Sequence, residues 1–234
     1  MCRASRQGGE GMDWTRSIDA YCERLDPGFW AEPVNALTNA GFLVAAVAVW
    51  IFWRAEQQRD VPRTPAGDWA VPALIFILFV IGIGSFLFHT IATRWSALAD
   101  VVPIAVFIHF YFFLAMRRIL CLGLVLSVAL TLVFLFAGYG VAPLLSGAIG
   151  SSASYVPAAV AILAVAAVAR RLNRAAAGPL ALVGAIFMIS LAFRTADIPF
   201  CPSFPLGTHF VWHCLNAVVL YLLIRTLIRT SLRS

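Results

Sequence analysis

The sequence predicts an all-α integral membrane protein built as a bundle of seven transmembrane helices. Of its 234 residues, 62% are hydrophobic and only 12% are charged, whereas soluble domains carry about 25% charged residues. The apolar residues gather in stretches of about 20, the length of a helix that spans a bilayer. All 17 basic residues are arginines, and they stand in short groups between the apolar stretches, as topology signals do.

Seven apolar stretches are expected to cross the membrane. Residues 1–34 are polar and contain no apolar core of a cleavable signal peptide, so the first span is expected to act as an uncleaved anchor. A Gly/Ser/Ala-rich stretch near 146–154 predicts a short outer loop between the fourth and fifth spans. The predicted spans cover residues 35–53, 69–89, 98–116, 119–138, 153–169, 179–196 and 207–225.

The arginines also predict the orientation of the chain. Eleven of them follow the odd-numbered spans, on a side with only three acidic residues, while the other side holds six arginines and eight acidic residues. The positive-inside rule then places the N-terminus outside and the C-terminus in the cytoplasm. We expect an extracytoplasmic segment (1–34), a seven-helix domain (35–225) and a cytoplasmic tail (226–234). The absence of lysine suggests a GC-rich bacterial genome and hence a multi-pass protein of the bacterial inner membrane.

The basic balance does not indicate a nucleic acid as partner. In a soluble protein, a pI near 9.5 would suggest nucleic-acid binding. Here the arginines are dispersed between apolar stretches, and no basic face with interleaved aromatic residues appears. The membrane itself is the predicted partner.

Several polar residues interrupt the apolar stretches. A charged residue at the centre of a span costs about 2.5–3.5 kcal/mol and usually marks function. In the predicted topology, every one of these residues lies toward the outer end of its helix. The sequence therefore predicts one polar cavity near the outer face, lined by Glu32, Asn35, Asn39, Ser85, His89, Asp100, Arg194, Asp197, His209 and His213.

Three histidines of this group form a candidate metal site. His209 and His213 are four residues apart, so a helix places both rings on one face, about 6 Å apart at Cβ, where they could bind one metal. A hydrogen-bonded pair between helices is the alternative. His89, expected at the same depth, would add a third ligand, and three protein ligands with one open position are typical of catalytic zinc. His109 lies deeper and is expected to be structural.

Two further polar residues are candidates for chemistry. Ser85 precedes His89 by one helical turn and is expected to project beside the metal, although a hydroxyl bonded to its own helix is the alternative. Asp100 could orient a histidine or deprotonate a metal-bound water, and its alternative role is a helix cap.

The cysteines predict one cross-link. Cys22 and Cys201 are both expected outside, where oxidation is possible. A bridge between them would tie the N-terminal segment to the loop before the last span, and two free thiols are the alternative. Cys121 and Cys214 are expected to pack within spans.

The sequence resembles the alkaline ceramidases from about residue 19 to residue 225. That family belongs to a superfamily of seven-helix membrane hydrolases that also contains the adiponectin receptors. The resemblance is carried, in order along the chain, by Tyr21-Cys22-Glu23, by the run from Phe29 to Asn39, by Gly84-Ser85-Phe86-Leu87-Phe88-His89, by Asp100, by Asp197 and Cys201, and by His209-Phe210-Val211-Trp212-His213.

The resemblance implies a zinc-dependent hydrolase. It implies His89, His209 and His213 as zinc ligands and Ser85 and Asp100 as catalytic residues. The implied reaction is attack of a zinc-activated water on the amide of ceramide or a related N-acyl lipid, which releases a sphingoid base or amine and a free fatty acid. The lipid substrate would arrive from the bilayer.

The resemblance also implies a calcium site near the first span. Eukaryotic members bind calcium through an Asp-Trp-Cys-Glu-x-Asn stretch and a later Glu, which would correspond here to Asp19, Tyr21, Glu23 and Glu32. Carboxylates suit this hard cation. However, Asp19 stands one residue too early and Leu25 occupies the place of the Asn. A solvated acidic segment is the alternative.

Three other functions remain open at this point. The first is a seven-helix receptor or lipid-binding protein of the adiponectin-receptor type, without turnover. The second is a di-haem electron carrier with histidine ligands, which the spacing of His209 and His213 on one helix disfavours. The third is an intramembrane serine protease with Ser85 as nucleophile, for which no base is evident besides the three candidate zinc ligands.

Overall fold

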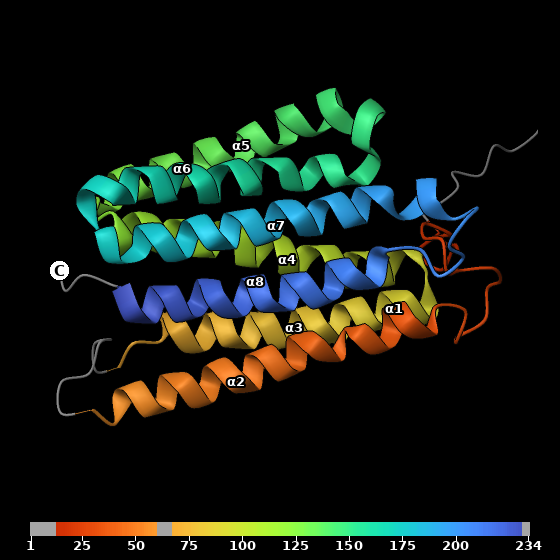
Figure 1. The fold of residues 1–234 in the computed structure, drawn as a ribbon, viewed down its shortest axis with the longest axis horizontal. Coiled ribbons are helices and arrows are strands. Elements are labelled where there is room, and N and C mark those ends of the chain that lie inside the picture. The colour runs from red at the N-terminus through yellow and green to blue at the C-terminus, as the bar shows by residue number, and fades with distance from the viewer. Residues whose placement is uncertain (1–12, 60–66, 231–234) are drawn as a thin grey trace, which may run out of the picture.

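The computed structural model describes residues 13–59 and 67–230, and these form a bundle of helices (Figure 1). Residues 1–12 of the predicted extracytoplasmic segment and residues 231–234 of the predicted cytoplasmic tail lie outside the described residues. The helices are α1 (Pro33–Thr38), α2 (Ala40–Gln57), α3 (Ala70–Ile91), α4 (Arg94–Leu114) with a π-helical turn (Ala115–Ile119), α5 (Leu124–Ile149), a 3₁₀ segment (Gly150–Tyr155), α6 (Val156–Leu172), α7 (Arg174–Phe200) and α8 (His209–Thr230).

Six helical segments of the described chain are long and apolar enough to cross a membrane. This confirms the prediction of an all-helical, membrane-associated protein. The segments are Pro33–Gln57, Ala70–Ile91, Arg94–Ile119, Leu124–Leu172, Arg174–Phe200 and His209–Thr230.

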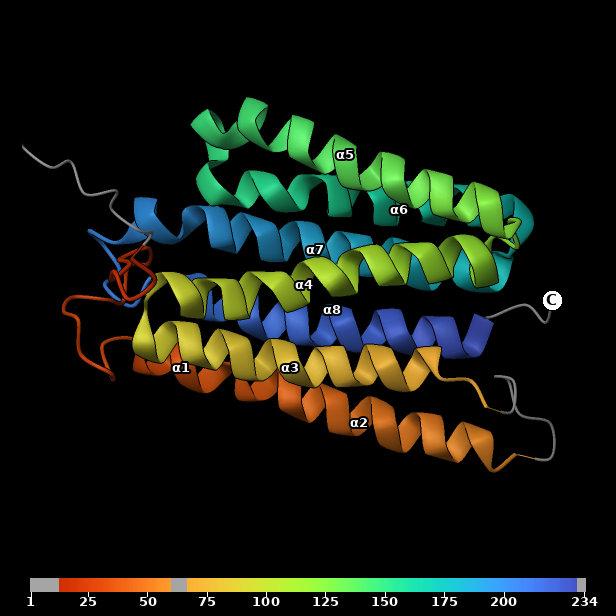
Figure 2. The same ribbon diagram turned by 180° about the vertical axis from the view of Figure 1, so that it is seen from behind.

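The fourth of these segments contains both α5 and α6, which lie side by side in Figures 1 and 2. The chain turns at Gly150, which has a φ of 56°, a left-handed conformation that glycine adopts without strain. The predicted outer loop at 146–154 is therefore wrong in its first half, because α5 continues to Ile149 instead of ending near residue 138. Apolar residues continue through this stretch, and a helix need not stop where a bilayer does.

The helices pack through stripes of apolar residues. On α3, Leu74, Leu78 and Ile81 are fully buried, and their spacing of four and three residues puts them on one face. Phe76 and Phe79 on other faces of the same helix remain exposed. A helix with apolar side chains all round is expected where lipid replaces water.

The two ends of the bundle differ. Residues 13–32, drawn in red, lie at the end where α3 and α7 finish and α8 begins, and α8 ends at the opposite end (Figures 1 and 2). At that opposite end Arg118 binds Asp68 with two hydrogen bonds of 2.7 and 2.8 Å. The polar residues predicted to cluster therefore lie beside the N-terminal segment.

A disulfide bond between Cys22 and Cys201 confirms the predicted cross-link. It fastens the N-terminal segment to the end of α7. For the other two described cysteines, only the place of Cys214 within a helix, α8, agrees with the prediction. Cys121 lies in the turn before α5 with a φ of 54°, and Cys121 and Cys214 are both exposed, so neither packs in the core.

Candidate metal centre

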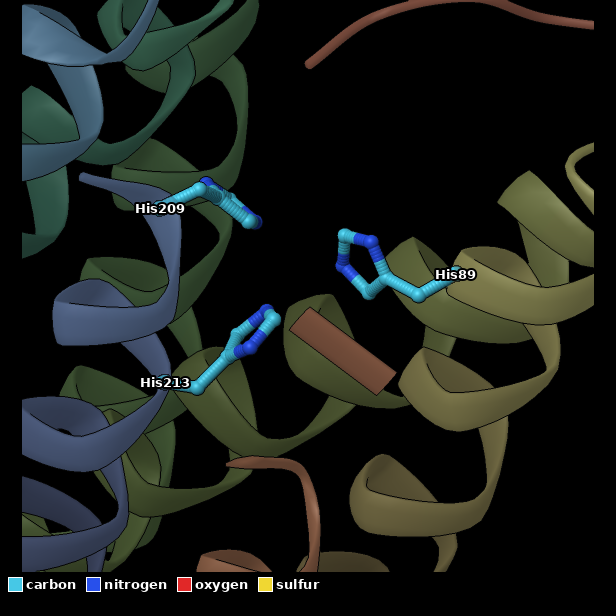
Figure 3. Close-up of side chains that lie close together, drawn as sticks. All are labelled: His89, His209 and His213. Carbon is cyan, nitrogen blue, oxygen red and sulfur yellow. The ribbon is translucent and has the colours of Figure 1, made fainter. Parts of the chain in front are cut away.

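The side chains of His89, His209 and His213 converge at the end of the bundle next to the N-terminal segment (Figure 3). His89 comes from α3, and the other two histidines come from α8. Their ring centroids lie 4.6 to 5.1 Å apart, and one ligand atom from each residue lies within 4.8 Å of the others. All three are at most 2% exposed.

Asp197 fixes the start of α8 and hence the position of His209. Its Oδ1 accepts hydrogen bonds from the backbone N–H groups of Thr208 at 2.7 Å and His209 at 2.9 Å. Its Oδ2 accepts one from the N–H of Cys22 at 2.9 Å. Gly207 has a φ of 63°, and a Cβ there would lie 2.2 Å from Asp197 Oδ1. Only glycine fits this turn, which lets one carboxylate cap the helix and hold the N-terminal segment.

Glu32 orients His89. Its Oε2 accepts a hydrogen bond from Nδ1 of His89 at 2.6 Å. With Nδ1 protonated, the other ring nitrogen, Nε2, can act as a metal ligand. Burial alone would raise the pKa of Glu32, but hydrogen bonds from His89, Arg24 and Asn35 hold it below its usual value. The carboxylate is therefore ionised where it meets the imidazole.

Thr38 plays the same part for His213. Its Oγ1 lies 2.9 Å from Nδ1 of His213 and itself donates to the backbone oxygen of Val34 at 2.8 Å. The hydroxyl therefore accepts a hydrogen bond from the ring, and Nδ1 of His213 carries the proton. The nitrogen of His213 that can bind a metal is then Nε2.

Two ring nitrogens in this cluster lack protein partners. Nε2 of His89 and Nδ1 of His209 are buried and have no hydrogen-bond partner among the described residues. The ring of His209 stacks on Tyr21 with a centroid separation of 3.7 Å. Unpaired polar atoms are costly in a buried site, and imidazole nitrogens are preferred ligands of zinc. The residues present therefore fit a zinc ion.

Ser85 and Asp100 meet beside the histidines because α3 and α4 pack closely at Gly84. A Cβ on Gly84 would lie 2.0 Å from the backbone oxygen of Ala99. The hydroxyl of Ser85 is within hydrogen-bonding reach of the Asp100 carboxyl group, which interacts electrostatically with His89. Asp100 is buried, and its Oδ1 has no partner among the described residues.

Asp100 is not a helix cap. The helix α4 begins at Arg94, six residues earlier. Its first turn is capped by Thr93 and Ser96, with a hydrogen bond of 2.9 Å from the N–H of Thr93 to Oγ of Ser96. Because Oδ1 of Asp100 has no partner among the described residues, Asp100 could either orient a histidine or deprotonate a metal-bound water.

The predicted structural role of His109 agrees with its position. Its Nδ1 lies 2.8 Å from the backbone oxygen of Ala105 on the same helix, so the ring is not part of the cluster.

The residues of the predicted calcium site have other partners or face solvent. Both carboxylate oxygens of Glu23 accept backbone N–H groups at the start of α1, from Val34 at 2.7 Å and Asn35 at 2.8 Å. Tyr21 covers His209, and Asp19 is exposed.

A half-buried guanidinium lies at the rim of the cluster. Arg194 on α7 donates hydrogen bonds to the hydroxyls of Ser151 and Ser152 at 2.9 and 3.0 Å. Its guanidinium carbon lies 5.1 Å from the ring centre of Tyr155 and 5.5 Å from that of Trp212. Arg194 was expected in the polar cavity, and it joins α7 to the 3₁₀ segment there.

Sequence reasoning missed Thr38 and Arg24. Thr38 lies on the same helical face as Asn35, three residues earlier, and this spacing is the signal that could have found it. No sequence signal distinguishes Arg24 from a solvated arginine in a polar segment, although it is only 5% exposed in the structure.

An apolar cavity of about 80 Å³ lies within the bundle, and its lining on α8 runs from Trp212 to Leu223. Phe42, Trp212 and Asn216 line it near the histidines, and the ring centroid of Phe42 is 6.2 Å from that of His213. A larger apolar groove of about 920 Å³ runs along α4, α5 and α6. The cavity and the groove share the lining residues Ile104, Ile108, Phe134, Tyr155 and Ala158.

Comparison with known proteins finds no matching family model and no matching protein of curated function. The fold and the site by themselves define a class: a helical membrane-type bundle with a buried three-histidine cluster at one end.

Proposed function

We propose that this protein is a zinc-dependent membrane amidase that hydrolyses the amide bond of ceramide or a related N-acyl lipid. The products would be a sphingoid base or amine and a free fatty acid. The observation that carries the proposal is the buried convergence of His89, His209 and His213. The resemblance to alkaline ceramidases assigns zinc to the same three residues and supplies the reaction class.

The neighbouring residues support hydrolysis. A zinc ion held by the three histidines would polarise the amide carbonyl and lower the pKa of a water molecule toward neutrality. The unpartnered Oδ1 of Asp100 would accept a proton from water and pass it to the leaving amine. The hydroxyl of Ser85 would donate a hydrogen bond to the oxyanion that develops on the carbonyl oxygen.

The apolar cavity and the groove that shares lining residues with it support a lipid substrate. An alkyl chain in the cavity would place its polar end near His213, because Phe42 lines the cavity and approaches that ring. The shared lining residue Phe134 lies on α5, so chains could arrive from the side of the bundle. A site reached from lipid does not require the substrate to leave the bilayer.

We also infer seven crossings, with the N-terminus outside and the metal centre near the periplasmic face of a bacterial inner membrane. The arginine distribution supports this orientation. The side-by-side arrangement of α5 and α6 supports counting them as two crossings. Residues 35–225 would then form the hydrolase domain.

The test is purification in detergent, metal analysis and a screen of lipid amides for release of free fatty acid. The proposal expects zinc bound to the wild-type chain and turnover of at least one long-chain amide. Zinc binding without release of fatty acid from any amide would instead favour the receptor-type alternative. Full activity in a metal-free preparation would refute the zinc mechanism.

A further inference from the structure

Arg24 is a buried cation beside the candidate metal centre. It is 5% exposed, and its guanidinium donates hydrogen bonds to three backbone oxygens and one carboxylate. Nη1 donates to the backbone oxygens of Asp26 at 3.1 Å and Gly28 at 3.4 Å. Nη2 donates to the backbone oxygen of His89 at 3.1 Å, and Nε donates to Oε1 of Glu32 at 2.5 Å. A planar guanidinium can make all these bonds at once, which an ammonium group cannot.

Glu32 connects this cation to the histidine cluster. One of its oxygens accepts from Arg24, and the other accepts from Nδ1 of His89 at 2.6 Å and from the Asn35 side chain at 3.1 Å. The carboxylate is therefore held from both sides. Because Nδ1 of His89 is bonded in this way, its Nε2 is the nitrogen left for a ligand.

The same carboxylate is one of the groups that the resemblance assigns to calcium, and the residues present do not fit that ion. Glu32 is only 2% exposed, and both of its oxygens are occupied, one of them by a positive charge in direct contact. A calcium ion at this carboxylate would face the guanidinium of Arg24 at close range, where like charges repel strongly. Glu23 uses both of its oxygens to cap α1.

We propose that Arg24 is the resident cation of this segment and acts as a positioning residue for the metal centre, so that the site works without calcium. Its guanidinium holds the Glu32 carboxylate against His89 and fastens the N-terminal segment to the end of α3 through the His89 carbonyl. The inference rests on the proposed function in one respect, that the three histidines hold zinc.

The first experiment measures zinc affinity by competition with a chromogenic chelator in three variants. Removal of the charge in Arg24→Gln is expected to weaken zinc binding about 10- to 100-fold, the range seen when a partner of a metal ligand is lost. Arg24→Lys keeps the positive charge but not the planar set of N–H donors, so zinc affinity is expected to fall less in this variant than in Arg24→Gln. Arg16→Gln, at an exposed arginine of the same segment, should bind zinc as the wild type does.

The second experiment adds calcium chloride, up to millimolar concentrations, to zinc-loaded wild type in calcium-depleted buffer. The inference expects no change in thermal stability or zinc affinity and no calcium in the purified protein. Stabilisation by calcium would overturn it. So would a zinc affinity in both Arg24 variants equal to that of wild type.

The two experiments separate this inference from the proposed function. If the wild type binds no zinc, the proposed function fails first. If the wild type binds zinc but is stabilised by calcium, only the inference fails. The same holds if substitution of Arg24 leaves zinc affinity unchanged. Should Arg24→Gln not fold, Arg24→Lys and the calcium titration of the wild type still decide the matter.

Discussion

Thr38 on α1 and His213 on α8 are joined by a hydrogen bond of 2.9 Å between Oγ1 and Nδ1. The pair brings together residues 175 positions apart in the chain. Its geometry matches the pairing of Glu32 with His89, since in both cases a side chain from the first span or just before it fixes the Nδ1–H tautomer. The first span is therefore part of the candidate metal centre without supplying a ligand to it.

Thr38→Val removes the acceptor while keeping the shape of the side chain. Zinc affinity is expected to fall about tenfold, because His213 loses the partner that sets its tautomer and ring orientation. Chelator competition measures the change. Thr131→Val is the matched control, since Thr131 also bonds its own helix, to Ser127 at 2.8 Å, but lies on α5 away from the cluster. Equal zinc affinity in the two variants would contradict the role of Thr38.

Gly84→Ala tests the close packing of α3 against α4. The added Cβ would collide with the backbone oxygen of Ala99, so the helices must separate next to Ser85 and Asp100. Overpacking of this kind costs about 1–3 kcal/mol, and a lower thermal midpoint with reduced hydrolysis is expected. Gly140→Ala, where a Cβ meets nothing within 4 Å, is the control and should leave both the midpoint and hydrolysis unchanged or raise the midpoint slightly. A Gly84→Ala protein as stable and active as the wild type would argue against this account of the contact.

Asp197→Asn tests the cap of α8. The substitution replaces one of the two acceptor oxygens by an amide nitrogen, which leaves at least one of the N–H groups of Cys22, Thr208 and His209 without its acceptor. A lost hydrogen bond to a buried group costs about 1–3 kcal/mol, so the thermal midpoint and zinc affinity should both fall. Asp26→Asn, in an exposed turn where Oδ1 accepts from Gly28 at 2.6 Å, should change neither. An unaltered midpoint in Asp197→Asn would show that the cap is dispensable.

Ser85→Ala and Asp100→Asn separate catalysis from metal binding. Neither residue is a predicted ligand, so both variants should retain zinc. Loss of an oxyanion donor or of a general base lowers turnover by about 100-fold or more, and the release of fatty acid should fall accordingly. Ser127→Ala, on α5 with its hydroxyl bonded to Gly123 at 2.9 Å, should keep wild-type turnover. Zinc loss in the Ser85 or Asp100 variant, or unchanged turnover, would remove the assigned roles.

The all-helical fold and the convergence of the three histidines could be predicted from the sequence, because both depend on the spacing of residues along the chain. Membrane helices need long apolar stretches, and residues at the same depth in adjacent helices meet at one end of the bundle. His209 and His213 share a face by helical period alone, and the placement of His89 required only the order of the spans. The Cys22–Cys201 bridge followed from the same topology.

Other features depend on tertiary contacts that spacing does not encode. The burial of Arg24 depends on how residues 24–32 fold back over α3, which no periodicity predicts. The role of Gly84 depends on the distance between two helix backbones. The end of α5 was misplaced by eleven residues, at 138 instead of Ile149, because a bilayer-length window assumes that helix and bilayer end together.

The most direct test of the central claim is the zinc content of purified wild type compared with His89→Ala, His213→Ala and His109→Ala, measured by mass spectrometry of the metal. His109 bonds its own helix at Ala105 and serves as the matched control. The account predicts one zinc per chain in the wild type and in His109→Ala, and loss of zinc together with loss of amide hydrolysis in the other two. Wild-type protein without zinc, or His89→Ala and His213→Ala proteins that retain zinc and activity, would contradict it.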